Sequence, residues 1–175
     1  CLGDMSRRRS YTSPGHTNEV NALRRTLINR LTMLAPDTVS IEQNTTANTD
    51  EFIAQRIGMI PFVQGDDQGE CSTLEVSGRN AVASDFVGRQ AVYPDVIVAV
   101  IDHDQTLKLS VDFSKGQAVT HARFAKTCAV GMKPEKKGAT ISFETLLPDD
   151  HATCLQEAFS ALENYLTDVR ATMVE

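Results

Sequence analysis

Residues 18–36 read NEVNALRRTLINRLTMLAP, a stretch whose apolar residues recur every three or four positions. The apolar residues are Val20, Leu23, Leu27, Leu31 and Leu34. This spacing places them on one face of an α-helix. Asn18 is a suitable N-cap and Glu19 complements the helix dipole in the first turn, whereas Pro36 ends the segment. The pattern predicts an amphipathic helix of about four turns that follows Asn18 and is ended by Ala35-Pro36-Asp37.

A second, longer helix is predicted over residues 152–174, after the start signal Pro148-Asp149-Asp150. Its apolar residues also follow steps of three and four: Leu155, Phe159, Leu162, Leu166, Val169 and Met173. Such a helix would be about 35 Å long. Because that length is large for so small a chain, we expect the helix to extend beyond its own domain and to pack on a partner. The alternative is that it lies flat on a sheet of its own chain.

The segments between the two helices predict one further helix and several strands. Thr49-Asp50 caps a short helix that Gly58 ends. The predicted strands are residues 39–43, 73–77, 96–101, 106–113, 128–133 and 140–146. Alternation is strictest where Leu107, Leu109 and Val111 alternate with polar residues. The mixture of long helices and strands predicts an α+β fold.

The composition excludes several classes of protein. The chain has 175 residues, of which 41% are hydrophobic and 6% aromatic, so it can form an aliphatic core and is not disordered throughout. The net charge of −6 argues against a free-standing nucleic-acid binder. Residues 1–17 are interpreted as a tail or a partial strand, and Arg7-Arg8-Arg9 within them as solvated charges.

The four cysteines, at positions 1, 71, 128 and 154, form no Cys-x-x-Cys pair. We therefore expect neither a zinc site nor a disulfide framework. No signal peptide and no apolar run of membrane-spanning length is found, so we expect an intracellular protein that is not secreted. The glycosylation pattern Asn44-Thr45-Thr46 is accordingly interpreted as accidental. Because residue 1 is Cys rather than Met, the true start is expected upstream or to have been processed.

No active site is predicted within the chain. Two-metal catalysis needs a tight cluster of carboxylates, and Asp66-Asp67 and Asp102-His103-Asp104 lack a convergent third ligand. His121 is interpreted as a structural, hydrogen-bonded histidine. The alternative hypothesis is a small stand-alone hydrolase that uses His103 or His121 with neighbouring aspartates.

Four segments in the right order carry a resemblance to a known family. Asn21-Ala22-Leu23-Arg24-Arg25-Thr26-Leu27 and residues 50–61, DEFIAQRIGMIP, resemble segments of the α-like subunits of RNA polymerase. The second segment is similar to the archaeal D and eukaryotic Rpb3-type pattern. Residues 39–44 and the return His121-Ala122-Arg123-Phe124 are also similar to family segments. The resemblance runs from about residue 18 to the C-terminal end.

The resemblance implies a domain organisation. Residues 1–62 and 120–175 would form a discontinuous dimerisation domain, a sheet with long packing helices. Residues 63–119 would form a small all-β insert domain. This insert is compressed and contains only Cys71, so the zinc site of eukaryotic Rpb3 is not expected, and Phe124 replaces the family's Trp. A polymerase encoded by a large DNA virus is one origin that would fit such a trimmed member.

The resemblance also implies a function. The chain would be a non-catalytic assembly subunit of a DNA-directed RNA polymerase that heterodimerises with an Rpb11-like or L-like small subunit. It would then dock the two largest subunits, and an Rpb10-like or N-like small subunit is a further candidate partner. The catalytic magnesium would lie in a large subunit, and no cofactor, no sequence-specific DNA contact and no membrane contact is expected of this chain. A homodimer like that of bacterial α is disfavoured because residues 50–61 follow the archaeal and eukaryotic pattern.

Partner contacts are expected on both long helices. Asn21 and the pair Arg24-Arg25 would lie on the side of the first helix that meets a large subunit, because guanidinium groups pair well with carboxylates across an interface. The alternative is that both arginines are ordinary solvated helix charges. The apolar residues expected to meet the small subunit are Leu23, Leu27, Leu31, Leu155, Phe159, Leu162, Leu166 and Val169.

Overall fold

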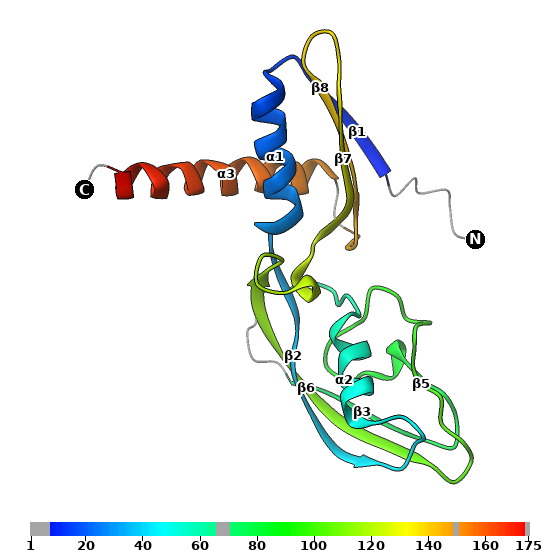
Figure 1. Ribbon diagram of the computed structural model, residues 1–175. Coiled ribbons are helices and arrows are strands. Elements are labelled where there is room, and N and C mark those ends of the chain that lie inside the picture. The colour runs from blue at the N-terminus through cyan, green and yellow to red at the C-terminus, as the bar shows by residue number, and fades with distance from the viewer. Residues whose placement is uncertain (1–7, 66–70, 149–150, 174–175) are drawn as a thin grey trace. The chain divides into compact units, whose positions relative to one another are not determined.

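The computed structural model describes residues 8–65, 71–148 and 151–173. Its three α-helices are α1 (Thr17–Asn29), α2 (Asp50–Gly58) and α3 (His151–Met173), with the short 3-10 turns η1 (Ala83–Asp85) and η2 (Ala122–Phe124). The strands are β1 (Arg8–Ser13), β2 (Thr32–Asn44), β3 (Ser72–Ser77), β4 (Ala81–Val82), β5 (Ile97–Ala99), β6 (Thr106–Gln117), β7 (Thr127–Pro134) and β8 (Ala139–Thr145). The fold is therefore α+β (Figure 1). The predictions made for Arg7, Asp66-Asp67 and Asp149-Asp150 fall outside the described residues.

The chain divides into two compact units. Unit 1 comprises Cys1–Thr32 and Gln117–Glu175, and unit 2 comprises Met33–Gly116. The boundaries inferred from the resemblance lay instead after residues 62 and 119. The first boundary differs because α2 packs its buried residues Ile53 and Ile57 into the core of unit 2. In this structure residues 33–62 therefore belong to unit 2. Their assignment to a dimerisation domain, which the resemblance implies, stays a prediction.

Unit 1 is built on an antiparallel sheet of order β1-β8-β7. Its core contains Val20, Leu23, Leu27 and Leu31 from the first helical region, Ala139, Ile141 and Phe143 from β8, and Cys154 and Ala158 from α3. Residues 8–13 form a regular strand, with Tyr11 opposite Ile141, and the Tyr11 ring stacks on that of Phe143 at a centroid distance of 6.0 Å. The polar segment that could have been a tail is thus part of the sheet.

The first helix is shorter than its apolar pattern predicts. It begins after His16 rather than Asn18, and the His16 backbone N–H donates to Glu19 Oε2 at 3.2 Å. It ends at Asn29, so the predicted helical positions Leu31 and Leu34 lie outside it. Both residues are nevertheless buried: Leu31 lies in the core of unit 1, and Leu34 lies in the core of unit 2 because the chain continues from residue 32 as strand β2 beside β6. Strand pairing with a distant segment has overridden the local helical spacing.

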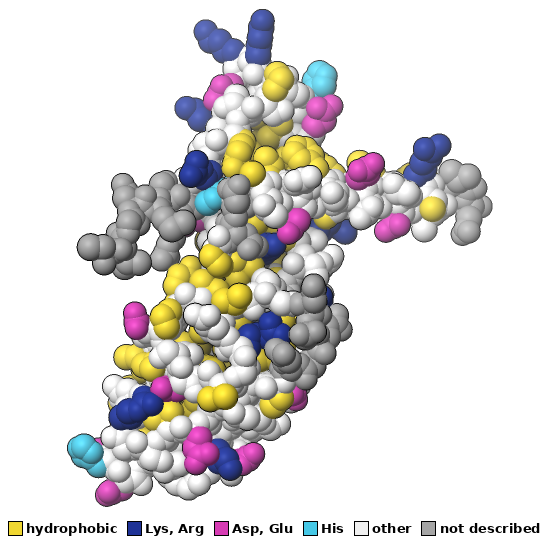
Figure 2. Space-filling model, turned by 180° about the vertical axis from the view of Figure 1, so that it is seen from behind, with side chains coloured by type: hydrophobic (Ala, Val, Ile, Leu, Met, Phe, Trp, Pro, Cys, Tyr) yellow, Lys and Arg dark blue, Asp and Glu magenta, His cyan; other side chains and the backbone are white. Residues whose placement is uncertain are grey.

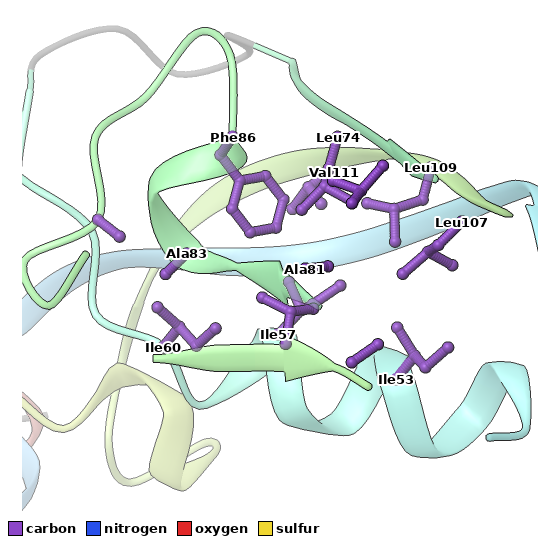
Figure 3. Packing of buried hydrophobic residues seen from close by; sticks show 14 of the residues in the cluster. Ile53, Ile57, Ile60, Leu74, Ala81, Ala83, Phe86, Leu107, Leu109 and Val111 are labelled. Carbon is purple, nitrogen blue, oxygen red and sulfur yellow. The ribbon is translucent and has the colours of Figure 1, made fainter. Parts of the chain in front are cut away.

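Unit 2 contains a sheet of order β2-β6-β3, and α2 covers one face of it. The small antiparallel pair β4-β5 belongs to the same unit. The alternation predicted in β6 is confirmed: Leu107, Leu109 and Val111 are buried, and Leu109 lies opposite Leu74 of β3. Figure 3 shows Ile53 and Ile57 of α2 on the opposite side of this cluster from Leu107 and Leu109. Burial of one face of each element holds the unit together.

Charged pairs support the polar parts of unit 2. Lys108 lies opposite Glu75, and its Nζ is 2.9 Å from Glu42 Oε2, so the hydrogen bond that Lys108 donates to Glu42 raises the pKa of Lys108. In the loop after β3, both oxygens of Asp85 accept from Arg79, at 2.7 and 2.8 Å. The bond from Arg79 lowers the pKa of Asp85 below its ordinary value of 3.8.

Candidate partner-binding surface

An exposed apolar seam runs along α3. We define the α3 seam as Leu155, Phe159, Leu162, Leu166, Val169 and Met173. The steps between its members alternate strictly between four and three residues, the spacing of an interhelical seam. At about 100° per residue, all six positions lie within about 40° of one line along the helix. The seam is therefore a narrow, continuous stripe.

Most of the seam is uncovered in this chain. The exposed fraction is 55% for Phe159, 58% for Leu166 and 82% for Met173. Leu155, Leu162 and Val169 are half-buried. Seen from behind, Figure 2 shows hydrophobic side chains at the base of the α3 arm and near its end. Large apolar side chains repeated along one line are a typical partner-binding feature, unlike single exposed ones.

A different side of α3 is held by its own chain. Cys154 and Ala158 are fully buried against the core of unit 1. Arg30, the C-cap of α1, places its guanidinium 3.7 Å from the centre of the Tyr165 ring. Figure 1 shows α3 crossing α1 and continuing well past it. The rotation of α3 about its axis is therefore fixed by its own chain, with Leu155 of the seam packed against the core of unit 1 and the rest of the seam beside these contacts.

An ion pair fixes the start of α3. The Lys126 ammonium lies 3.0 and 2.8 Å from the two carboxylate oxygens of Glu157. Lys126 is buried whereas the Glu157 side chain is 42% exposed. A buried ammonium needs such a partner, since desolvation of an unpaired charge is unfavourable. Lys126 lies in the segment before β7, so the pair joins the sheet region to α3.

The polar side of α3 borders an open groove of about 730 Å³ within unit 1. Its lining includes Arg30, Leu31, Thr32 and Gln117, together with Gln156, Ser160, Asn164 and Asp168 of α3. These α3 residues lie on the side of the helix away from the seam. The lining also contains Ala161 and Tyr165 of α3, so the groove is partly apolar and reaches the edge of the seam.

The apolar residues of α1 do not form a comparable surface. Leu23, Leu27 and Leu31 are 7%, 1% and 3% exposed, because β7, β8 and α3 of the same chain cover them. Leu31 also lies beyond the end of α1. These three residues were expected to meet a small subunit. In the structure they lie in the core of unit 1, where α3 also packs.

The polar residues predicted on α1 have two different environments. Arg24 is half-buried, and its Nε donates to Asn21 Oδ1 at 3.0 Å. Arg25 is exposed. A guanidinium that is exposed on a rigid helix suits a carboxylate of a second protein, whereas Arg24 is already oriented by Asn21. Contact with a large subunit stays a prediction for these residues.

The candidates for an independent active site do not converge. His121 Nδ1 accepts from the Arg123 backbone N–H at 3.1 Å. The backbone N–H of His103, not its ring, donates to Asp102 Oδ1 at 2.8 Å. Among the residues that the structure describes, no group of three His, Cys, Asp or Glu could hold a metal ion. Nothing in these surroundings favours the hydrolase hypothesis. Within the same described ranges, no helix has the length and apolarity needed to cross a membrane.

The chain is similar to curated subunits of DNA-directed RNA polymerase. The DNA-directed RNA polymerase subunit Rpo3 of Natronomonas pharaonis is 28% identical over 145 residues, which cover 78% of this chain and 59% of the relative. Subunit Rpo3 of Pyrobaculum aerophilum is 31% identical over 134 residues, covering 63% of this chain and 52% of the relative. Subunit 3 of RNA polymerases II, IV and V of Arabidopsis thaliana is 28% identical over 152 residues, covering 63% and 48%. The chain is a divergent homologue of these Rpo3/Rpb3-type subunits.

The resemblance based on residues 21–27 and 50–61 is thus confirmed. No family model matches the chain. The chain spans about half to three-fifths of the length of these relatives, with covered shares of 59%, 52% and 48%. It follows that the activity and the partners of a whole Rpb3-type subunit cannot simply be transferred to it.

Sequence reasoning identified the seam but missed what orients it. The five α3 residues expected at the interface lie together on the seam, and Met173 extends it. Arg30, Tyr165 and the Lys126–Glu157 pair had no recognisable signal, because each contact joins segments that are far apart in the sequence. Only the packed chain brings them together.

Proposed function

We propose that the chain is a non-catalytic assembly subunit of a multisubunit DNA-directed RNA polymerase. It pairs through the α3 seam with a smaller Rpb11-like or L-like subunit, and the pair then docks the two largest subunits. The relatives are named as subunits of DNA-directed RNA polymerases, which supports membership of such a complex. The exposed α3 seam is the observation that supports pairing.

The physical reason is the free energy of covering apolar surface. Removing apolar surface from water contributes about 25 cal/mol per Å². Obligate interfaces bury about 2,000 Å² or more and have apolar cores, so the seam would be the centre of a larger contact. Because its own chain already holds α3 in place, little conformational entropy is lost when a partner binds.

Other surfaces are assigned to later steps of assembly. The exposed Arg25 on α1 is proposed to meet a large subunit. On unit 2, Phe52 of α2 and the C-cap residue Met59 are 45% and 58% exposed, and Arg56 Nη2 donates to the neighbouring Ile97 carbonyl at 2.6 Å. We assign this apolar face to further contacts within the polymerase, with an Rpb10-like or N-like subunit as one candidate. Catalytic magnesium belongs to a large subunit in this proposal.

The experiment is co-expression of the tagged chain with the Rpb11-like subunit of the same polymerase. Leu166→Asp should abolish co-purification, because pairing would bury an unpaired carboxylate. Ala171→Asp is the matched control, since Ala171 is exposed on the opposite side of α3. The melting temperature of the isolated chain should be nearly the same for both variants. Co-purification of Leu166→Asp at the yield of the unmodified chain would show that the seam is not the pairing surface.

A further inference from the structure

The two flanks of the α3 seam have different surroundings. One flank contains Ala158, which is buried, and Tyr165, which is covered by Arg30. The other flank contains Gln156, Glu163 and Arg170, all of which are exposed. A helix that packs along the seam meets charged side chains of α3 on this second flank, at Glu163 and Arg170.

A second copy of α3 fits the seam poorly. Strand β8 leads directly into α3, so an antiparallel pair keeps the two sheets at opposite ends. With full overlap, Leu162 lies beside Leu166 of the second copy and Phe159 beside its Val169. In that register Glu163 faces Glu163 of the second copy across the two-fold axis. Like charges at facing flank positions destabilise a helix pair.

Sliding the second copy along α3 by one heptad, which is seven residues, relieves the repulsion between the two Glu163 side chains but removes apolar contact. It places Glu163 opposite Arg170 of the second copy, which is a favourable pair. However, the shift leaves Leu155 and Phe159 without a facing layer, and these are two of the six seam residues. An antiparallel self-pair therefore either opposes two carboxylates or loses part of the seam.

We propose that Glu163 selects a helix of a different chain over a second copy. The partner helix runs antiparallel to α3, carries Lys or Arg opposite Glu163, and carries Asp or Glu opposite Arg170. This inference rests on the proposed function, in which the seam is the pairing surface. The apolar seam supplies the affinity, and the charged flank supplies the choice of partner.

The test uses the chain itself as the partner. A Glu163→Lys copy presents a cation opposite Glu163 of the unmodified chain, in the full-overlap register. Sedimentation equilibrium of the mixture should give an association constant roughly tenfold above that of either chain alone. Glu163→Gln alone should self-associate about threefold more strongly than the unmodified chain. Both differences should shrink in 1 M salt, where the Debye length is about 3 Å.

Two controls separate this inference from the proposed function. Ala171→Lys adds the same cation on the far side of α3 and should not strengthen association with the unmodified chain. Leu166→Asp should abolish association in every mixture. If Leu166→Asp leaves co-purification with the small subunit unchanged, the seam is not an interface and the proposed function fails. If Leu166→Asp abolishes that co-purification but the Glu163→Lys and Ala171→Lys mixtures associate equally, or neither mixture associates, only the role of Glu163 is overturned.

Discussion

Replacing Leu27 by alanine tests whether the apolar face of α1 belongs to the core of this chain or to an interface. Leu27 is 1% exposed and packs in the core of unit 1, whereas Leu166 on α3 is 58% exposed. A buried Leu→Ala change removes apolar contacts and leaves a cavity, at a cost of about 2–5 kcal/mol. For a chain of this size, about 2–4 °C is lost per kcal/mol, so Leu27→Ala should lower the melting temperature by about 5–15 °C.

Leu166→Ala is the matched variant with the same chemical change. Because Leu166 is mostly exposed, its replacement should alter the free energy of unfolding by no more than about 0.5 kcal/mol. Thermal unfolding of the isolated chains, followed by circular dichroism, measures both effects, and co-purification with the small subunit measures pairing. Leu27→Ala should lose stability first, and Leu166→Ala should lose pairing first. The opposite result, a stable Leu27→Ala chain that no longer pairs, would refute the assignment of α1 to the core.

Three further changes test individual contacts. Asp85→Asn removes a charge whose folded-state pKa lies below 3.8, so the wild-type advantage in melting temperature should be full at pH 6 and be lost as the pH falls through that lower pKa; an advantage that does not decline with pH in acid would contradict this. Glu157→Gln removes the carboxylate that lies 2.8 Å from the buried Lys126 ammonium and should lower the free energy of unfolding by about 1–3 kcal/mol in urea titrations; an unchanged urea midpoint would exclude a stabilising pair. Gly138→Ala should destabilise the chain by about 2 kcal/mol or more in thermal unfolding, because φ is +93° and a Cβ would overlap the backbone before α1. A Cβ added at Gly58 meets no atom within 4 Å, so Gly58→Ala is the control. Equal melting temperatures of the Gly138→Ala and Gly58→Ala variants would disprove the steric explanation.

Elements whose boundaries depend on local signals were predicted well. Thr49 and Gly58 delimit α2 as expected, and the alternation of Leu107 and Leu109 gives the correct buried face of β6. The predicted terminal helix begins one residue after α3 does, and its last predicted residue, 174, lies outside the described residues. In each case one strong periodic pattern, or a cap and a stop signal, acts within a few residues.

Elements that depend on distant segments were predicted less well. The apolar spacing of Leu31 and Leu34 continued the helical pattern, yet both residues follow the end of α1, and β2 begins at Thr32. Residues 8–13 carried few apolar side chains, yet they form an edge strand because β8 offers a partner. Strand formation depends on a neighbouring strand, and local spacing contains no information about that neighbour.

The sequence by itself determined which faces are apolar. It placed the seam on the terminal helix, it placed the leucines of α1 on one side, and it carried the resemblance to the Rpb3-type subunits. Only the tertiary structure decided which of these faces its own chain covers: Leu27 is buried, whereas Leu166 is not. The physical reason is that periodicity is a local property of the helix, whereas burial depends on which distant segments pack against it.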